Sequence, residues 1–342
     1  MRRRGVNYDV GVSYDIGNER GGLVVTHPTF DSQCVHRELE IIQQDLHCNA
    51  IRISGRSIER LMLATEAALK QGLEVWLSPL LYDQDEQETL DYIRECAMEA
   101  ERLRSFFPQL IFILGCELTL FMQGIVEGKN IIERLPALKS VVKTGAHNKP
   151  LNAFLAKANQ TVRQVFSGAV TYASAPLEQV DWSLFDFVCA DVYREKRIKE
   201  VYSNLITSYF AHNKPVIITE FGCCTYRGAE DVGGMGWAIL DETIMPVEQL
   251  KGDYVRDERL QAREITDLLG ILDGTGVNGA FVYIFHFPAL VHHESDPRRD
   301  LDMASYGLVK SYADGRHGAS YPDMPWEPKE SFKAVADYYA AH

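Results

Sequence analysis

Residues 110–117 read LIFILGCE, an apolar run that ends on Glu117. A second stretch, PVIITEFG at residues 215–222, repeats the pattern around Glu220. Continuous apolar runs of this kind are typical of parallel strands that are buried on both faces. Each stretch therefore predicts a buried parallel strand with a carboxylate at or near its carboxyl end.

Six more apolar runs alternate with longer segments of helical periodicity. The predicted strands are residues 5–11, 49–54, 73–81, 110–116, 169–173, 185–192, 215–221 and 279–285. The predicted helices are residues 32–47, 57–71, 86–106, two within 131–166, 195–210, 258–272 and 330–340. Eight strand–helix units in a chain of 342 residues predict one domain, residues 1–342, folded as a (β/α)₈ TIM barrel. A doubly wound open sheet is the alternative, but no glycine-rich phosphate-binding motif follows the first strand.

The composition narrows the classes of partner. The formal net charge of -13 disfavours nucleic acid and anionic membranes, which are polyanions. The three arginines at positions 2–4 are not followed by the apolar segment of a signal peptide. Seven scattered cysteines without a C-x-x-C pair are typical of reduced thiols. We therefore expect a cytoplasmic protein with no membrane partner, and the sequence leaves its oligomeric state open.

The active site of such a barrel lies at the carboxyl ends of its strands. Polar residues at these predicted ends are Asn7, Tyr8, Arg52, Glu117, Tyr172, Asp191, Tyr193, Glu220, Tyr283 and His286. A carboxylate at the end of a buried strand loses solvation and requires a partner or a chemical task. Glu117 and Glu220 are therefore either structural ion-pair members or a working pair.

Four motifs carry a resemblance to a known group of enzymes. The stretches "ITEFG", "NAIRIS", "FDFVCADVY" and "YGLVKSYADG…PWEPKESFKAVADYY" resemble clan A of the glycoside hydrolases, which are retaining (β/α)₈ enzymes. The resemblance implies that Glu117 is the acid/base and Glu220 the nucleophile. It also implies that Arg52 orients Glu220 and that the Tyr193 hydroxyl touches it. More narrowly, "GVNYD", "VTYA" and "VDWSLFDFV" resemble a bacterial group labelled abortive-infection proteins, which implies a role in phage defence.

One position departs from the clan pattern. The clan has an asparagine that binds the sugar 2-hydroxyl immediately before the acid/base, whereas this chain has Cys116. A thiol is a weak hydrogen-bonding group, so either Asn7 supplies the contact or the substrate presents no equatorial 2-hydroxyl there. The strand-eight tryptophan of many members is also not evident, and Phe285 or Tyr283 is the candidate sugar platform in its place. We further expect Trp237, in the loop 225–255, and His286 to contact substrate.

These observations predict a retaining glycoside hydrolase that acts on an oligosaccharide or glycoside without a cofactor or metal. Its two carboxyl groups should lie about 5–5.5 Å apart. One alternative is a catalytically silent barrel that binds carbohydrate or a protein partner. Another is a metal-dependent barrel hydrolase that uses the His-rich segment 286–296. Against the latter, such barrels usually carry H-x-H on the first strand, and this chain has Asn7-Tyr8-Asp9 there.

Overall fold

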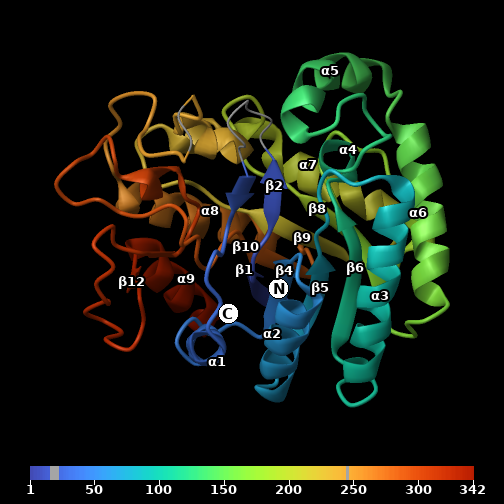
Figure 1. Ribbon diagram of the computed structural model, residues 1–342, viewed down its shortest axis with the longest axis horizontal. Coiled ribbons are helices and arrows are strands. Elements are labelled where there is room, and N and C mark those ends of the chain that lie inside the picture. Colours follow the sequence, from blue (N-terminus) through green and yellow to red (C-terminus); the bar gives the residue numbers. More distant parts are fainter. Residues whose placement is uncertain (16–22, 244–245) are drawn as a thin grey trace.

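The centre of the molecule is a closed barrel of eight parallel strands (Figure 1), seen here in a computed structural model that describes residues 1–15, 23–243 and 246–342. The strands follow one another around the barrel in the order β1-β10-β9-β8-β7-β6-β5-β4, and β4 closes the ring against β1. Their bounds are β1 Arg3–Asp9, β4 Ala50–Gly55, β5 Glu74–Pro79, β6 Leu110–Cys116, β7 Val170–Ser174, β8 Val188–Asp191, β9 Val216–Phe221 and β10 Gly279–Val282. The predicted (β/α)₈ barrel is therefore confirmed.

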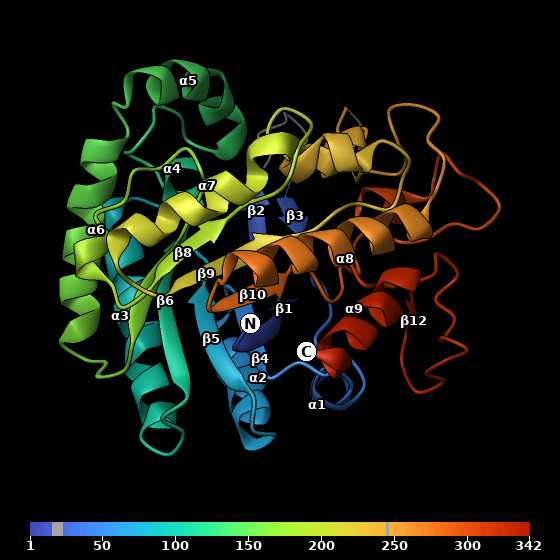
Figure 2. The ribbon, with the colours of Figure 1, turned by 180° about the vertical axis from the view of Figure 1, so that it is seen from behind.

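Helices cover the outside of this barrel and the carboxyl ends of its strands (Figure 1). They are α1 Ser32–Gln44, α2 Ile58–Lys70, α3 Glu86–Arg104, α4 Leu118–Phe121, α5 Ile131–Thr144, α6 Asn148–Arg163, α7 Tyr202–Ser208, α8 Glu258–Thr275 and α9 Glu330–Ala341. Two small antiparallel sheets lie outside the barrel. One pairs β2 Ser13–Asp15 with β3 Leu23–Val25, and the other pairs β11 Val309–Lys310 with β12 Glu327–Pro328. In Figure 1, α2, α3 and α6 lie along the strands, and Figure 2 shows α8 and α9 side by side on the opposite face.

Local sequence signals explain where several helices begin. The Ser57 side chain accepts a hydrogen bond from the Arg60 amide at the start of α2, as an N-cap residue does. Asp85 and Glu88 form a reciprocal capping box at the start of α3. The segment predicted as one helix, residues 195–210, differs: α7 covers only Tyr202–Ser208 and is flanked by 3₁₀ turns. The short helix α4 was not predicted, because four residues show no helical period.

The barrel interior is filled by side chains, so the chemistry must lie at an end of the barrel. The interior cluster consists of buried residues such as Trp76, Ile113, Cys189, Ile217 and Phe281. The rings of Trp76 and Phe281 lie 5.5 Å apart between centroids, which is contact range for aromatic side chains. A larger apolar cluster packs between the strands and the helices. Within the described parts of the chain, no helix combines the length and apolarity needed to cross a bilayer.

Candidate active site

Glu220 is a carboxylate at the carboxyl end of the barrel that an arginine and a tyrosine bind. It lies in β9, and its side chain is 15% exposed. The Arg52 guanidinium, from β4, donates to its Oε1 at 2.6 Å, and the Tyr193 hydroxyl, just after β8, donates to its Oε2 at 2.8 Å. A charge-assisted bond and a phenolic bond both favour the ionised carboxylate. Both contacts predicted for Glu220 are therefore present.

Two neutral side chains also bind the Arg52 guanidinium. Asn7 Oδ1 accepts a hydrogen bond from Arg52 at 3.1 Å, and the Arg52 guanidinium donates to Ser78 Oγ at 3.2 Å. Asn7 also donates through its amide nitrogen to the Thr219 carbonyl at 2.9 Å. Asn7 and Arg52 are each only 1% exposed. Both polar ends of Asn7 are thus occupied inside the barrel, so Asn7 positions Arg52 and is not available to a sugar hydroxyl.

Cys116 and Asp191 lie beside the Glu220–Arg52 pair. The Cys116 sulfur is 3.4 Å from Asp191 Oδ2 and 3.8 Å from Glu220 Oε1. Asp191 Oδ1 is 3.9 Å from Arg52. Burial and the Glu220 charge raise the pKa of Asp191 to about 8, although Arg52 acts in the opposite direction. Burial and the charge of Asp191 also raise the pKa of the Cys116 thiol, so the thiol is protonated at neutral pH. The site therefore holds several carboxyl groups but one arginine.

Cys116, Asp191 and Glu220 also form a possible metal-binding set. Their ligand atoms all lie within 4.8 Å of one another, and no other set of three His, Cys, Asp or Glu residues does so within residues 1–15, 23–243 and 246–342. The Arg52 guanidinium already supplies a positive charge to Glu220 in this set. The set is therefore a carboxylate–thiol cluster that already contains one guanidinium charge.

Glu117 follows β6 directly, with an unusual backbone conformation. Its φ of 46° and ψ of 45° place it in the left-handed region, which costs a non-glycine residue about 1–3 kcal/mol and tends to occur at functional sites. The side chain is partly exposed. Burial raises the pKa of Glu117 well above its usual 4.5, and the charges of Asp191 and Glu220 raise it further. Glu117 is therefore within electrostatic range of Glu220, and its surroundings favour the protonated carboxyl group.

Glu178 is a buried carboxylate near Glu117 that the sequence did not reveal. Its Oε1 accepts from the Thr119 amide and its Oε2 from the Ala175 amide, both at 3.0 Å. The Tyr172 hydroxyl bonds the same carboxylate at 2.9 Å and accepts from the Leu118 amide at 2.7 Å. Tyr172 therefore contacts the backbone of Leu118, the residue that follows Glu117. The loop sequence around Glu178 has no periodicity or motif that could have identified it.

Two predicted contact residues are not brought to this cluster. The Tyr8 hydroxyl donates to Glu38 Oε2 on α1, outside the barrel, and Tyr8 is 3% exposed. His286 is buried, bonds Ser311 Oγ through its Nε2 atom at 2.9 Å, and has Nδ1 at 3.7 Å from Glu38. These two side chains thus belong to a second polar cluster between β1, α1 and the segment after β10. Tyr8 and His286 therefore lie outside the candidate site.

An aromatic cluster surrounds the Tyr193 ring. Tyr193 meets Tyr283 and Tyr306 edge to face, with centroids 6.2 and 5.4 Å apart. The partly buried Trp237 packs against the same apolar cluster from the 3₁₀ segment η5, Gly233–Ile239. The Tyr306 hydroxyl donates to the Gly233 carbonyl at 2.6 Å. This fixes the middle of the loop 225–255, in which residues 244–245 lie outside the described part of the chain.

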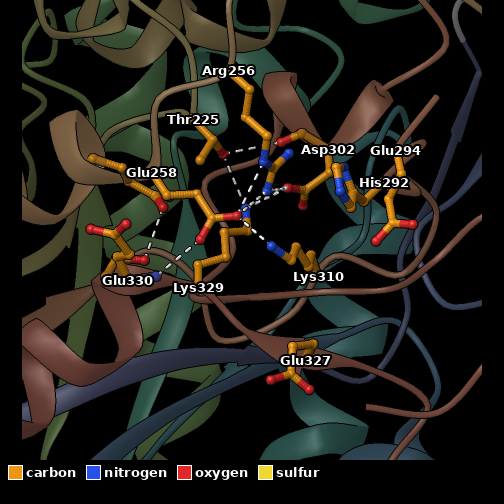
Figure 3. A network of polar contacts seen from close by, with 12 residues as sticks. Thr225, Arg256, Glu258, His292, Glu294, Asp302, Lys310, Glu327, Lys329 and Glu330 are labelled. Atoms are coloured by element: carbon orange, nitrogen blue, oxygen red, sulfur yellow. Dashed lines mark hydrogen bonds and ion pairs between the residues drawn. The ribbon is translucent and has the colours of Figure 1, made fainter. Parts of the chain in front are cut away.

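A buried ionic network anchors the loops that follow β9 and β10 (Figure 3). Lys329 Nζ lies 2.9 Å from Asp302 Oδ2 and 3.1 Å from Thr225 Oγ1. Arg256 pairs with Asp302 at 2.7 Å and with Glu258 at 2.8 Å. The Lys329 side chain has no solvent exposure. The network therefore ties α8 and α9 to the loop segments that lead to Tyr306 and away from Glu220.

Comparisons with known proteins agree with this architecture. No family model matches the chain, and no curated protein matches it. Among solved structures it is similar to a GH113 β-1,4-mannanase, with 13% identity, a TM-score of 0.60 and all of both chains covered. It is similar to a GH113 β-mannanase from Alicyclobacillus acidocaldarius, with 14% identity, a TM-score of 0.60, and 99% of this chain and 97% of that chain covered.

A third similar structure, β-glucuronidase 2 of Bacteroides uniformis, has 16% identity and a TM-score of 0.53. The match covers all of this chain and 35% of that longer chain. At identities this low the likeness concerns the fold. The chain shares its closed eight-stranded barrel with glycoside hydrolases.

Proposed function

We propose that this protein is a retaining glycoside hydrolase in which Glu220 is the nucleophile and Glu117 the acid/base. The observation that carries the proposal is the difference between the surroundings of the two glutamates. Glu220 accepts hydrogen bonds from Arg52 and Tyr193, which favour its charged form. Burial and neighbouring carboxylates raise the pKa of Glu117 and favour its neutral form. Two carboxyl groups with such different surroundings suit the roles of nucleophile and proton donor.

The reaction would proceed in two steps. In the first, the Glu220 carboxylate attacks the anomeric carbon while the proton of Glu117 passes to the departing glycosidic oxygen, so that the sugar–oxygen bond breaks and a glycosyl ester forms. In the second, a water molecule gives a proton to the Glu117 carboxylate and attacks the same carbon, which releases Glu220. Two displacements at one carbon retain its configuration. Arg52 and Tyr193 hold Glu220 in position throughout.

We propose β-linked glycosides as the substrate class, with β-1,4-linked manno-oligosaccharides as the first natural candidates. The support is the full-length likeness to proteins named as β-1,4-mannanases.

Seven unpaired cysteines further favour a reducing compartment such as the cytoplasm. The phage-defence role that the sequence resemblance implies concerns biology rather than chemistry, and it is compatible with hydrolysis of a glycoside.

A substrate panel tests the proposal. Aryl pyranosides and furanosides of both anomers, together with β-1,4-manno-oligosaccharides, are incubated with the wild-type protein and with Glu220→Ala. We expect hydrolysis of at least one β-glycoside by the wild type, with the first-formed product in the β-configuration by NMR, and no turnover by the variant. Hydrolysis that is equally fast in the variant, or an inverted first product, would contradict the assignment. A protein that binds these sugars but hydrolyses none would favour the silent-barrel alternative.

A further inference from the structure

The backbone around Glu117 requires an external support. A left-handed conformation at a glutamate persists only where the surrounding structure fixes it. The four-residue helix α4 that follows is too short to supply this support from its own hydrogen bonds. The first amides after β6 must therefore be bound by other parts of the molecule.

Three successive amides are in fact bound by one neighbouring segment. The Glu117 amide donates to the Ala173 carbonyl of β7 at 2.9 Å. The Leu118 amide donates to the Tyr172 hydroxyl at 2.7 Å, and the Thr119 amide donates to Glu178 Oε1 at 3.0 Å. The turn that contains Glu117 is thus held by hydrogen bonds to β7 and to the loop that follows it. Two of its three contacts depend on the side chains of Tyr172 and Glu178.

Burial raises the pKa of Glu178, whereas the hydrogen bonds to Glu178 favour its ionised form. The Tyr172 oxygen accepts from the Leu118 amide, so the phenolic hydrogen is available to the Glu178 carboxylate. Each carboxylate oxygen of Glu178 also accepts a backbone amide, one from Thr119 and one from Ala175. The Thr119 amide, the Ala175 amide and the Tyr172 hydroxyl are all donors to Glu178, and a carboxylate is an acceptor-only group. A glutamine at this position could accept only one of the two amides and would turn an NH₂ group toward the other.

We propose that Glu178, acting through Tyr172, is a positioning residue that holds Glu117 in the orientation needed to protonate the leaving group. Among the described residues, Glu178 has hydrogen bonds to Tyr172, Thr119 and Ala175 and none to Glu220, Arg52 or Tyr193, so it acts on the acid step and not on the nucleophile. Its negative charge also contributes to the raised pKa of Glu117. The inference rests on the proposed glycosidase function for its kinetic test.

The test compares two leaving groups, because only a poor leaving group depends on the acid. A phenyl glycoside needs a proton from Glu117, whereas the dinitrophenyl glycoside of the same sugar does not. For Glu178→Gln we expect kcat on the phenyl glycoside to fall about 10²-fold, as for a small misplacement of a catalytic group, while kcat on the dinitrophenyl glycoside stays within about threefold of wild type. KM should change little for both. Tyr172→Phe should act in the same direction, and it serves where Glu178→Gln does not fold.

The chain offers a matched control in the buried Tyr8–Glu38 pair, which joins a strand tyrosine to a buried glutamate away from Glu117. Glu38→Gln should lower the melting temperature but leave the ratio of the two rates unchanged. Equal losses on both glycosides in Glu178→Gln, or no loss on either, would overturn the positioning role.

Hydrogen exchange separates this inference from the proposed function. Peptides that contain the Leu118 and Thr119 amides should exchange faster in Glu178→Gln than in wild type, and at wild-type rates in Glu38→Gln. Unchanged exchange in Glu178→Gln would overturn the support of Glu117 by Glu178. Absence of glycosidase activity in the wild-type protein, with faster exchange in Glu178→Gln, would instead defeat the proposed function alone.

Discussion

The Tyr193 hydroxyl donates a hydrogen bond of 2.8 Å to Oε2 of Glu220, opposite the oxygen that Arg52 binds. The two oxygens of this carboxylate are thus fixed by side chains from two different strands, Arg52 in β4 and Tyr193 just after β8. Burial and the Glu220 charge raise the pKa of Tyr193 well above 10, so the phenol remains a donor at any working pH. Glu220 can therefore rotate little, and its orientation is set before a substrate arrives.

Tyr193→Phe tests the importance of this bond. A hydrogen bond to a charged group contributes about 1.5–3 kcal/mol, so its loss should lower kcat/KM at least roughly tenfold. The phenyl ring keeps the edge-to-face contacts with Tyr283 and Tyr306, so the melting temperature should change little. Steady-state kinetics and a thermal melt check both statements. Unchanged kcat/KM would mean that the Tyr193 hydroxyl does not help to orient Glu220.

Glu117→Ala should separate substrates by their leaving groups. Without the proton donor, glycosides with poor leaving groups should lose about 10²–10⁴-fold in rate, the usual contribution of general acid catalysis. Aryl glycosides with good leaving groups should still form the glycosyl ester, because they depart without a proton. Rates on a series of aryl glycosides provide the measurement. An equal loss across the whole series would argue that Glu117 is not the acid.

The pH dependence of kcat/KM should show an alkaline limb set by Glu117. The group must be protonated to act, and its raised pKa keeps it protonated up to pH values well above 4.5, so activity falls as the pH rises through that pKa. Burial raises the pKa of Glu117 most, and among the neighbouring charges that of Asp191 raises this pKa most. Asp191, whose own pKa is raised to about 8, carries this charge in the alkaline range; Asp191→Asn removes it there, so the limb should move to lower pH. A limb that stays in place, or moves to higher pH, would contradict the coupling of these two carboxyl groups.

Lys329→Ala tests the ionic network of Figure 3. The substitution removes one partner of a fully buried ion pair and leaves Asp302 with less compensation, which should cost about 3–5 kcal/mol of unfolding free energy. The matched control is Lys333→Ala. Its partner is Asp337 at 2.6 Å, but both side chains are exposed, so about 0–1 kcal/mol is expected. Urea titrations give both values, and similar losses for the two variants would refute a structural role for the buried pair.

The sequence predicted the barrel because its strands are continuous apolar runs that are separated by amphipathic helices. It also placed Glu117, Glu220, Arg52 and Tyr193 at strand ends, and in the structure Arg52 and Tyr193 each contact Glu220. The individual roles of these residues stay predictions until the variants are measured. The phage-defence role stays a prediction as well.

The side of the barrel wall on which a residue lies was harder to predict. Neighbouring residues in a strand point to opposite faces, so Asn7 and Tyr8 could not both face the barrel interior. Asn7 faces inward to Arg52, whereas Tyr8 faces outward to Glu38. In β8 the register against β9 shifts between Ala190 and Asp191, so simple alternation would fail there too. Glu178 was missed because its role depends on a loop conformation that no local pattern encodes.

Chemical rescue of Glu220→Ala by azide tests the role of Glu220 most directly. We expect the variant to show no measurable turnover of an activated β-glycoside. Added azide should occupy the space left by the carboxylate, attack the anomeric carbon once, and give the α-glycosyl azide, identified by NMR. Normal turnover in the variant, or rescue that yields the β-azide, would contradict the assignment of Glu220 as the nucleophile.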